Sequence, residues 1–213
     1  MLVGAGHEIV NHTHTHPNLY HPGYAYARHE ELSRERFNSI SAAQREVEIN
    51  RCHQVCADVL DCEPIGFRSP HFGVLHVDDV YPMLSALGYR YSSSKMAAAS
   101  PTLGLPYVCH PGIWELPLSP CPQHPFGVFD SWHSIGKENA AHAGVGGLAA
   151  LFTDLAERVM GGGGYVNVYF DPLDAVESGE FGRILEFLSD SGLRVAAYRD
   201  LIGQLDATVA NSG

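Results

Sequence analysis

Segments with the apolar spacing of helices alternate with short β-rich runs, and this alternation constrains the fold of the chain more than any other feature. Helical spacing is present over residues 41–60, 78–89, 144–164 and 180–192. Runs with the character of strands begin at Ile9 and occupy residues 65–73, 90–94, 165–170 and 193–198. Strands that are separated by helices are typical of a mostly parallel sheet wrapped by helices. The sequence therefore predicts an α/β fold, either a barrel or an open sheet.

The length and composition predict a single domain that spans residues 1–213. Hydrophobic residues make up 45% of the chain and charged residues 17%, which is ordinary for a globular protein with a proper core. A net charge of −11 argues against nucleic acid or an anionic membrane as a partner. No run approaches the roughly 18 apolar residues of a membrane span. The five cysteines contain no CxxC pair, so neither a disulfide framework nor a zinc ribbon is expected.

The opening residues "MLVGAG" predict the end of a helix that is stopped by Gly4 and Gly6. Because a helix of about three residues cannot form alone, we expect the fold to include at least one strand and one helix before Met1. A sheet without its first strand would have an unpaired edge, which an oligomer of the chain would cover. No signal peptide is visible, and a cytoplasmic location is favoured, although a segment before Met1 would carry any targeting sequence.

The segment "GHEIVNHTHTHP" places His12, His14 and His16 at every second position. Both a strand and one helical turn let His12 and His16 converge, and Pro17 favours an extended His16. One interpretation is a metal site, because two neighbouring imidazoles bind one cation more easily than they both take a proton. The other interpretation is a strand with solvated histidines. The spacing favours the metal site.

Polar residues follow three of the predicted strands. His12 to His16 come after the first strand, Arg68 to Gly73 lie at the end of the second, and Asp171 follows residues 165–170. In parallel α/β folds the catalytic groups lie on loops at the carboxyl ends of strands. We therefore expect these segments to contribute to one functional site.

Two segments are predicted to be mainly loops. Residues 18–32 are rich in aromatics and turn formers and are expected to form a surface loop that closes over a small amide or borders a glycan groove. Residues 97–136 are rich in proline, with one or two strands near 108–120 and a turn at 126–134.

Several segments together resemble the polysaccharide deacetylase family, the metal-dependent carbohydrate esterases with a NodB homology domain. "HTHTH" at residues 12–16 resembles the His-[Ser/Thr]-x-x-His metal motif of this family, and "FRSPHFG" at residues 67–73 resembles its Arg-x-Pro motif. "LGYRYSSS", "ELPLSP" and the closing part from "YVNVYFDP" to "YRDLI" match later landmarks in the same order. The resemblance implies a distorted (β/α) barrel, here without its first strand and helix.

The resemblance also implies roles for single residues. It makes His12 and His16 ligands of a divalent metal and leaves His14 outside. Zinc is favoured, with cobalt, nickel, manganese or iron as alternatives. Arg68 would orient a basic aspartate, and a surface ion pair is the alternative. The backbone N–H of His71 would help to stabilise an oxyanion, while its side chain would line the groove.

Further residues are implied for the substrate groove and for the acid. Pro70 and Phe72 belong to the motif that lines one wall of the groove. Asp130 and Trp132 resemble a fourth motif, in which the aspartate tunes the acid and the tryptophan lines the pocket; a turn aspartate and a packed aromatic are the alternatives. Asp171 stands where the family has the histidine of Leu-x-x-His-Pro. We predict that Asp171 protonates the leaving amine, and the alternative is a turn-forming aspartate before proline.

The Thr-Phe-Asp-Asp-Gly motif of the family has no counterpart, because Asp78 and Asp79 fall in a predicted helix. The chain by itself is therefore expected to have little deacetylase activity. The predicted function is the hydrolysis of an acyl group, most simply acetyl, from the amide nitrogen of an N-acetylated sugar or polysaccharide, with the metal activating water. A small non-sugar amide is an alternative substrate. An inactive glycan-binding or scaffold module is an alternative function.

Overall fold

The computed structural model describes residues 3–17, 36–72, 76–131 and 147–211. The chain forms two compact units, and the prediction of a single domain stays a prediction. The first unit consists of Met1–Lys95, Pro106–Leu116 and Ala196–Gly213. The second consists of Met96–Leu105 and Pro117–Val195. Within the described ranges, no helix is long and apolar enough to cross a membrane.

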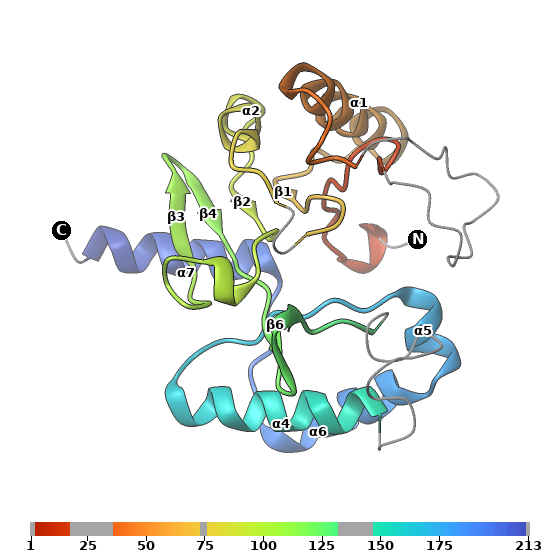
Figure 1. Cartoon of the computed structure of the whole chain (residues 1–213), viewed down its shortest axis with the longest axis vertical. Helices are drawn as coiled ribbons and strands as arrows, with labels where there is room; N and C mark the ends of the chain where they lie inside the picture. Colours follow the sequence, from red (N-terminus) through yellow and green to blue (C-terminus); the bar gives the residue numbers. More distant parts are fainter. Residues whose placement is uncertain (1–2, 18–35, 73–75, 132–146, 212–213) are drawn as a thin grey trace. The chain divides into compact units, whose positions relative to one another are not determined.

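The first unit is built on a four-stranded sheet in the order β1-β2-β4-β3, whose strands lie side by side in Figure 1. β1 (Gly66–Phe67), β2 (Tyr91–Ser92) and β4 (Ile113–Glu115) are parallel, whereas β3 (Tyr107–His110) is antiparallel to β4. The short 3-10 helix η1 (Val3–Ala5) precedes them. A parallel sheet with helices confirms the predicted α/β class.

The two faces of this sheet bury different side chains, because successive residues of a strand point to opposite sides. Phe67 and Ile113 pack in a core with residues of α1 (Ala42–Leu60) and α2 (Val80–Ala86). On the other face Tyr91 and Trp114 pack with Ile202 of α7 (Tyr198–Asn211). The sheet is therefore covered by helices on both faces.

Gly66 is required by the close approach of Tyr91 to β1. A Cβ atom at Gly66 would lie 2.1 Å from Cζ of the Tyr91 ring. The Tyr91 hydroxyl donates to Oε1 of Glu8 at 2.8 Å, and Oε2 of Glu8 accepts from the backbone N–H of Arg199 at 3.2 Å. The segment before the histidines is thus held to β2 and to the start of α7.

The helix predicted over residues 41–60 is confirmed as α1. The Oγ atom of Ser41 accepts from the backbone N–H of Gln44 at 3.3 Å, and Oε1 of Gln44 accepts from the backbone N–H of Ser41 at 2.9 Å. This reciprocal capping box fixes the start of the helix. Asp61, with a φ of 49°, ends it in the left-handed conformation.

The second unit combines two packed helices with a β-hairpin. α4 (Gly147–Gly162) and α6 (Glu180–Ser191) bury their apolar faces in one core. Oε2 of Glu180 accepts from the backbone N–H of Ala149 at 2.8 Å, which places a carboxylate at the positive end of the α4 dipole. The remaining elements are η3 (Ala97–Ala99), the antiparallel pair β5 (Pro120–Cys121) and β6 (His124–Val128), and α5 (Pro172–Glu177).

Several predicted elements differ from the structure. The turn predicted at 126–134 is wrong at its start, because residues 124–128 form β6. The strand predicted from Ile9 is reduced to one bridge between Asn11 and Phe67. The strand predicted over 165–170 is reduced to one bridge between Tyr169 and Asp130. The backbone N–H of Asn167 donates to the Ser119 hydroxyl at 2.9 Å instead of to a backbone carbonyl.

The C-terminal end of the chain also differs. Residues 193–197 form no strand, and α5 and α7 were not predicted. The strands of the described residues form an open sheet and a hairpin without closing a barrel, so the distorted barrel stays a prediction.

Candidate active site

The histidine segment leaves the sheet beside β1. Asn11, fully buried, donates its backbone N–H to the carbonyl of Gly66 at 3.0 Å, and its own carbonyl accepts from the N–H of Arg68 at 2.9 Å. The next residue, His12, donates from Nδ1 to the carbonyl of Arg68 at 2.7 Å. This hydrogen bond places the proton of the neutral ring on Nδ1 and leaves the lone pair on Nε2.

The loop after His12 is held by one carboxylate of α1. Oε2 of Glu48 accepts from the backbone N–H groups of Thr15 at 2.8 Å and of His14 at 3.1 Å. Oε1 accepts from the Thr15 hydroxyl at 2.9 Å. The His14 side chain is exposed, and its predicted place outside a metal site stays a prediction.

The His16 ring lies beside two other imidazoles, those of His12 and His71. The ring centroids of His12 and His16 are 4.8 Å apart, and those of His16 and His71 are 5.3 Å apart. The backbone is strained at this place, because Thr13, His16 and His71 have φ values of 71°, 50° and 49°. Non-glycine residues with positive φ concentrate at functional sites, where the surrounding structure offsets the strain.

Burial keeps two of these rings neutral. Desolvation, followed by repulsion from His16, lowers the pKa of His12 from 6.5 to about 4. The same two causes lower the pKa of His71 to about 4. Both imidazoles therefore hold a free lone pair at neutral pH, which is the form that binds metal ions.

This arrangement predicts that the metal-free protein loses stability as the pH falls from about 6.5 to about 4. In that window His12 and His71 bind protons in the unfolded chain but not in the folded chain, so the free energy of unfolding falls. For His12 alone the shift corresponds to about 3 kcal/mol at most. Urea unfolding at a series of pH values measures the effect. His12→Gln should flatten the pH dependence, whereas the exposed control His14→Gln should keep it.

Arg68 is fixed from two sides. Its Nε donates to the carbonyl of Ser93 at 2.9 Å, and its Nη2 donates to the Ser93 hydroxyl at 2.8 Å and to the Tyr198 hydroxyl at 2.9 Å. The guanidinium lies 5.5 Å from the centroid of the Phe72 ring. Pro70, between them in the chain, is buried. The half-buried guanidinium is therefore positioned by uncharged groups, and its predicted role toward a carboxylate stays a prediction.

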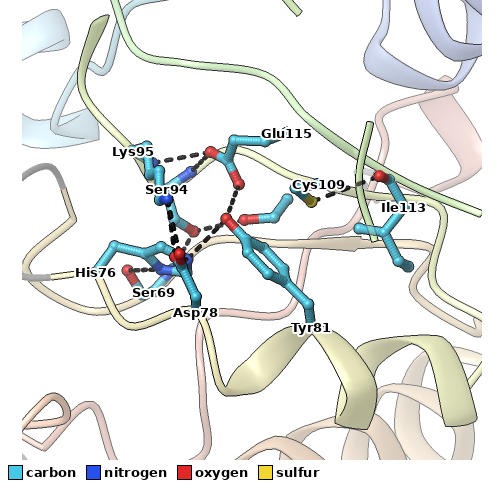
Figure 2. A network of polar contacts seen from close by, with 10 residues as sticks. Ser69, His76, Asp78, Tyr81, Ser94, Lys95, Cys109, Ile113 and Glu115 are labelled. Carbon is cyan, nitrogen blue, oxygen red and sulfur yellow. Dashed lines mark hydrogen bonds and ion pairs between the residues drawn. The ribbon is translucent and has the colours of Figure 1, made fainter. Parts of the chain in front are cut away.

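A second polar network connects Ser69, the residue after Arg68, to Glu115 (Figure 2). Glu115 of β4, fully buried, accepts from the backbone N–H groups of Ser94 at 2.7 Å and Lys95 at 2.8 Å, and from the hydroxyl of Tyr81 at 3.0 Å. Tyr81 in turn lies 3.0 Å from Nε2 of His76. The network links β4, α2 and the loop after β2.

The network reaches the Arg-x-Pro motif through His76 and Ser69. Because the Tyr81 proton goes to Glu115, Nε2–H of His76 donates to Tyr81, and Nδ1 accepts from the Ser69 hydroxyl at 3.4 Å. The backbone N–H of Ser69 donates to the Ser94 hydroxyl at 3.0 Å. Ser69, between Arg68 and Pro70, is thus held in place by Ser94 and His76.

The predicted acid residues belong to the second unit. The backbone N–H of Asp171 donates to the Ser131 hydroxyl at 2.6 Å, and its Oδ1 accepts from the backbone N–H of Leu173 at 3.0 Å. The second contact is that of a turn-forming aspartate at the start of α5. Asp130 pairs with Tyr169 in a parallel bridge. Trp132 lies outside the described residues, and the roles predicted for these three stay predictions.

Sequence reasoning missed Glu48, Ser93, Tyr198 and the network of Glu115. Glu48, Ser93 and Tyr198 lie in other elements than the residues they hold, so their spacing along the chain carries no signal. Glu115 could have been found from the sequence, because a carboxylate between Trp114 and Leu116 interrupts an apolar strand.

Comparisons with known proteins found similarity to polysaccharide deacetylases. Residues 1–92 match the family model described as "Polysaccharide deacetylase". A solved structure described as a "putative polysaccharide deacetylase from Mycobacterium smegmatis" matches with a TM-score of 0.70 at 18% sequence identity. The match covers 97% of this chain and 65% of that one, so this chain spans about two thirds of the length of that structure. No curated protein gave a match. Residues 1–92 are thus similar to the polysaccharide deacetylase family, and the second match shows a fold shared over nearly the whole chain.

Proposed function

We propose that the protein is a metal-dependent hydrolase that removes an acetyl group from the amide nitrogen of an N-acetylated sugar or polysaccharide. The observation that carries the proposal is the hydrogen bond from Nδ1 of His12 to the Arg68 carbonyl, together with the His16 ring beside that of His12. A carbonyl that accepts from one ring nitrogen of a histidine is the usual support of a metal ligand on the other nitrogen.

The residues present fit such an ion only in part. Across the ranges that the structure describes, no three His, Cys, Asp or Glu side chains are already arranged to hold a metal. Imidazole nitrogens are nevertheless donors that zinc binds well, with cobalt, nickel, manganese or iron as alternatives. When bound, the ion would supply Lewis acidity toward the acyl oxygen and toward water. His12 and His16 would hold it.

The other proposed roles belong to residues of the chain itself. Arg68, fixed by Ser93 and Tyr198, would orient a carboxylate through a charge-assisted hydrogen bond. The backbone N–H of His71 would donate to the developing oxyanion. Pro70 and Phe72 would line the substrate groove. Asp171, at the carboxyl end of residues 165–170, would deliver a proton to the leaving amine.

The proposal is tested by acetate release from N-acetylglucosamine oligomers with a zinc-loaded chain that is extended upstream of Met1, together with the zinc content per chain. We expect one zinc ion per chain and measurable acetate release. His12→Ala and His16→Ala should each lose the ion and lower turnover by at least about a hundredfold, because the ion supplies several kcal/mol of stabilisation.

His14→Ala is the matched control, since it removes an exposed imidazole from the same loop and should keep both zinc and activity. Equal loss in all three variants would contradict the ligand assignment. Binding of the oligomers without acetate release would favour an inactive glycan-binding module instead. Release of acyl groups from small amides alone would limit the proposal to non-sugar substrates.

A further inference from the structure

Glu115 is a fully buried carboxylate that no described cation balances directly. None of the ion pairs between described residues includes it, and the ammonium group of Lys95 is paired with Asp78 at 2.9 Å. His76, which reaches Glu115 through Tyr81, is kept neutral because burial lowers its pKa. Glu115 accepts all of its hydrogen bonds from described residues, which is the pattern of an ionised carboxylate. A buried charge is costly without a partner, so a counter-charge is expected near it.

One peptide unit joins Glu115 to Arg68. Oε1 of Glu115 accepts from the backbone N–H of Ser94 at 2.7 Å, and the carbonyl of Ser93 accepts from Nε of Arg68 at 2.9 Å. This N–H and this carbonyl belong to the same peptide group, the one between Ser93 and Ser94. The group is planar and trans, so its N–H and its carbonyl point in opposite directions. Glu115 and Arg68 therefore lie at the two ends of one peptide dipole.

The signs of the two charges match that dipole. The anion faces the positive N–H end and the cation faces the negative carbonyl end, so each hydrogen bond polarises the peptide in the direction that strengthens the other. The bond lengths of 2.7 Å and 2.9 Å are those of charge-assisted hydrogen bonds. The two charged groups are separated by roughly 8 Å at most, and at an effective dielectric constant of about 20 their attraction changes an equilibrium about 30-fold.

Further contacts fix the same segment and one side of the guanidinium. The backbone N–H of Lys95 also donates to Oε1 of Glu115, at 2.8 Å (Figure 2). The N–H of Ser93 donates to the Phe67 carbonyl at 2.9 Å, and the Ser93 hydroxyl accepts from Nη2 of Arg68 at 2.8 Å. The Nε and Nη2 atoms of Arg68 are thus bound by the protein. No described residue accepts from Nη1, which leaves this nitrogen to meet a carboxylate.

We propose that Glu115 is the positioning residue of Arg68, which it holds and balances in charge across the peptide unit between Ser93 and Ser94. The inference rests on the proposed function only for its part in the reaction, where Arg68 would orient a carboxylate through Nη1. This role explains why a glutamate stands in an apolar strand, since a glutamine would keep the hydrogen bonds but not the charge.

Glu115→Gln tests the role of the charge, because the amide oxygen of glutamine can still accept from Ser94 and Lys95. The readout is the Nε–H resonance of Arg68 in the isotope-labelled full chain, assigned by its loss in Arg68→Lys. Exchange of this proton with solvent should become at least about tenfold faster in Glu115→Gln, and the amide protons of Ser94 and Lys95 should move upfield. Glu46→Gln, which changes an exposed glutamate of the same unit, should match the wild type.

Tyr81→Phe separates the effect of the charge from that of packing. It removes a partner of the same carboxylate and loosens the network, but it keeps the charge of Glu115. The exchange rate at Arg68 should therefore stay close to that of the wild type. A wild-type exchange rate in Glu115→Gln, or an equal acceleration in Tyr81→Phe, overturns the inference.

The part in the reaction is tested by kinetics of the zinc-loaded chain that is extended upstream of Met1. Glu115→Gln should lower kcat by about tenfold and keep KM, since a misplaced Arg68 disturbs the carboxylate that it orients and not the bound substrate. An unchanged kcat overturns the positioning role. Absence of acetate release from the wild type overturns the proposed function alone, and the Arg68 resonance then decides this inference.

Discussion

Glu115→Ala is expected to lower the free energy of unfolding by about 3 to 5 kcal/mol. The substitution removes the acceptor for three donors, the backbone N–H groups of Ser94 and Lys95 and the hydroxyl of Tyr81. Each donor left unsatisfied in a buried site costs about 1–3 kcal/mol. The side chain is fully buried, so water does not replace the lost contacts unless the core opens. Urea unfolding followed by far-UV circular dichroism measures the loss.

The matched control is Glu157→Ala, because Glu157 is an exposed glutamate of α4 and should change stability by less than about 0.5 kcal/mol. Tyr81→Phe, which removes only the hydroxyl between Glu115 and His76, should give an intermediate loss of about 1 to 2 kcal/mol. A Glu115→Ala protein as stable as the control would mean that this network contributes nothing to holding the loop of Arg68.

Asn11→Ala is the second change with a large expected effect, about 3 to 4 kcal/mol in the free energy of unfolding. The Asn11 side chain donates from Nδ2 to the carbonyl of Ile49 at 3.0 Å and to the hydroxyl of Tyr89 at 2.7 Å, and its Oδ1 accepts from the backbone N–H of Thr13 at 2.8 Å. These bonds join α1, the segment between α2 and β2, and the histidine loop around the fully buried Asn11. Their loss leaves buried polar groups unpaired.

The same variant should weaken zinc binding, because the bond from Thr13 to Asn11 holds the backbone between His12 and the rest of the loop in its strained form. Asn50→Ala is the control, since Asn50 is exposed on α1. Unfolding and zinc titration of both variants separate the two effects. A destabilised Asn11→Ala protein with wild-type zinc affinity would show that the loop keeps its geometry without this anchor.

Helices α1 and α6 could be predicted from their own residues, because apolar spacing and capping residues lie within or next to the helix. The capping residues and apolar spacing of residues 41–60 predicted α1 correctly, and glycine at the end of residues 180–192 predicted the end of α6 at Gly192. The strands from Ile9 and over 165–170 were predicted from β-rich composition, but among the described residues each forms one isolated bridge, Asn11 with Phe67 and Tyr169 with Asp130, and no continuous ladder. Strand formation depends on a neighbour, which composition does not specify.

The sequence by itself was enough for the resemblance to polysaccharide deacetylases, the α/β class and the closeness of His12 to His16, because a five-residue segment keeps its two end histidines near each other whatever the rest of the chain does. Only the tertiary structure decided what surrounds that motif. His71 is 55 positions beyond His16, and Asn11 reaches Tyr89 and Ile49 from other elements. Contacts between such distant residues leave no periodic trace in a sequence, since their free energy comes from burial and pairing that exist only after the chain has folded.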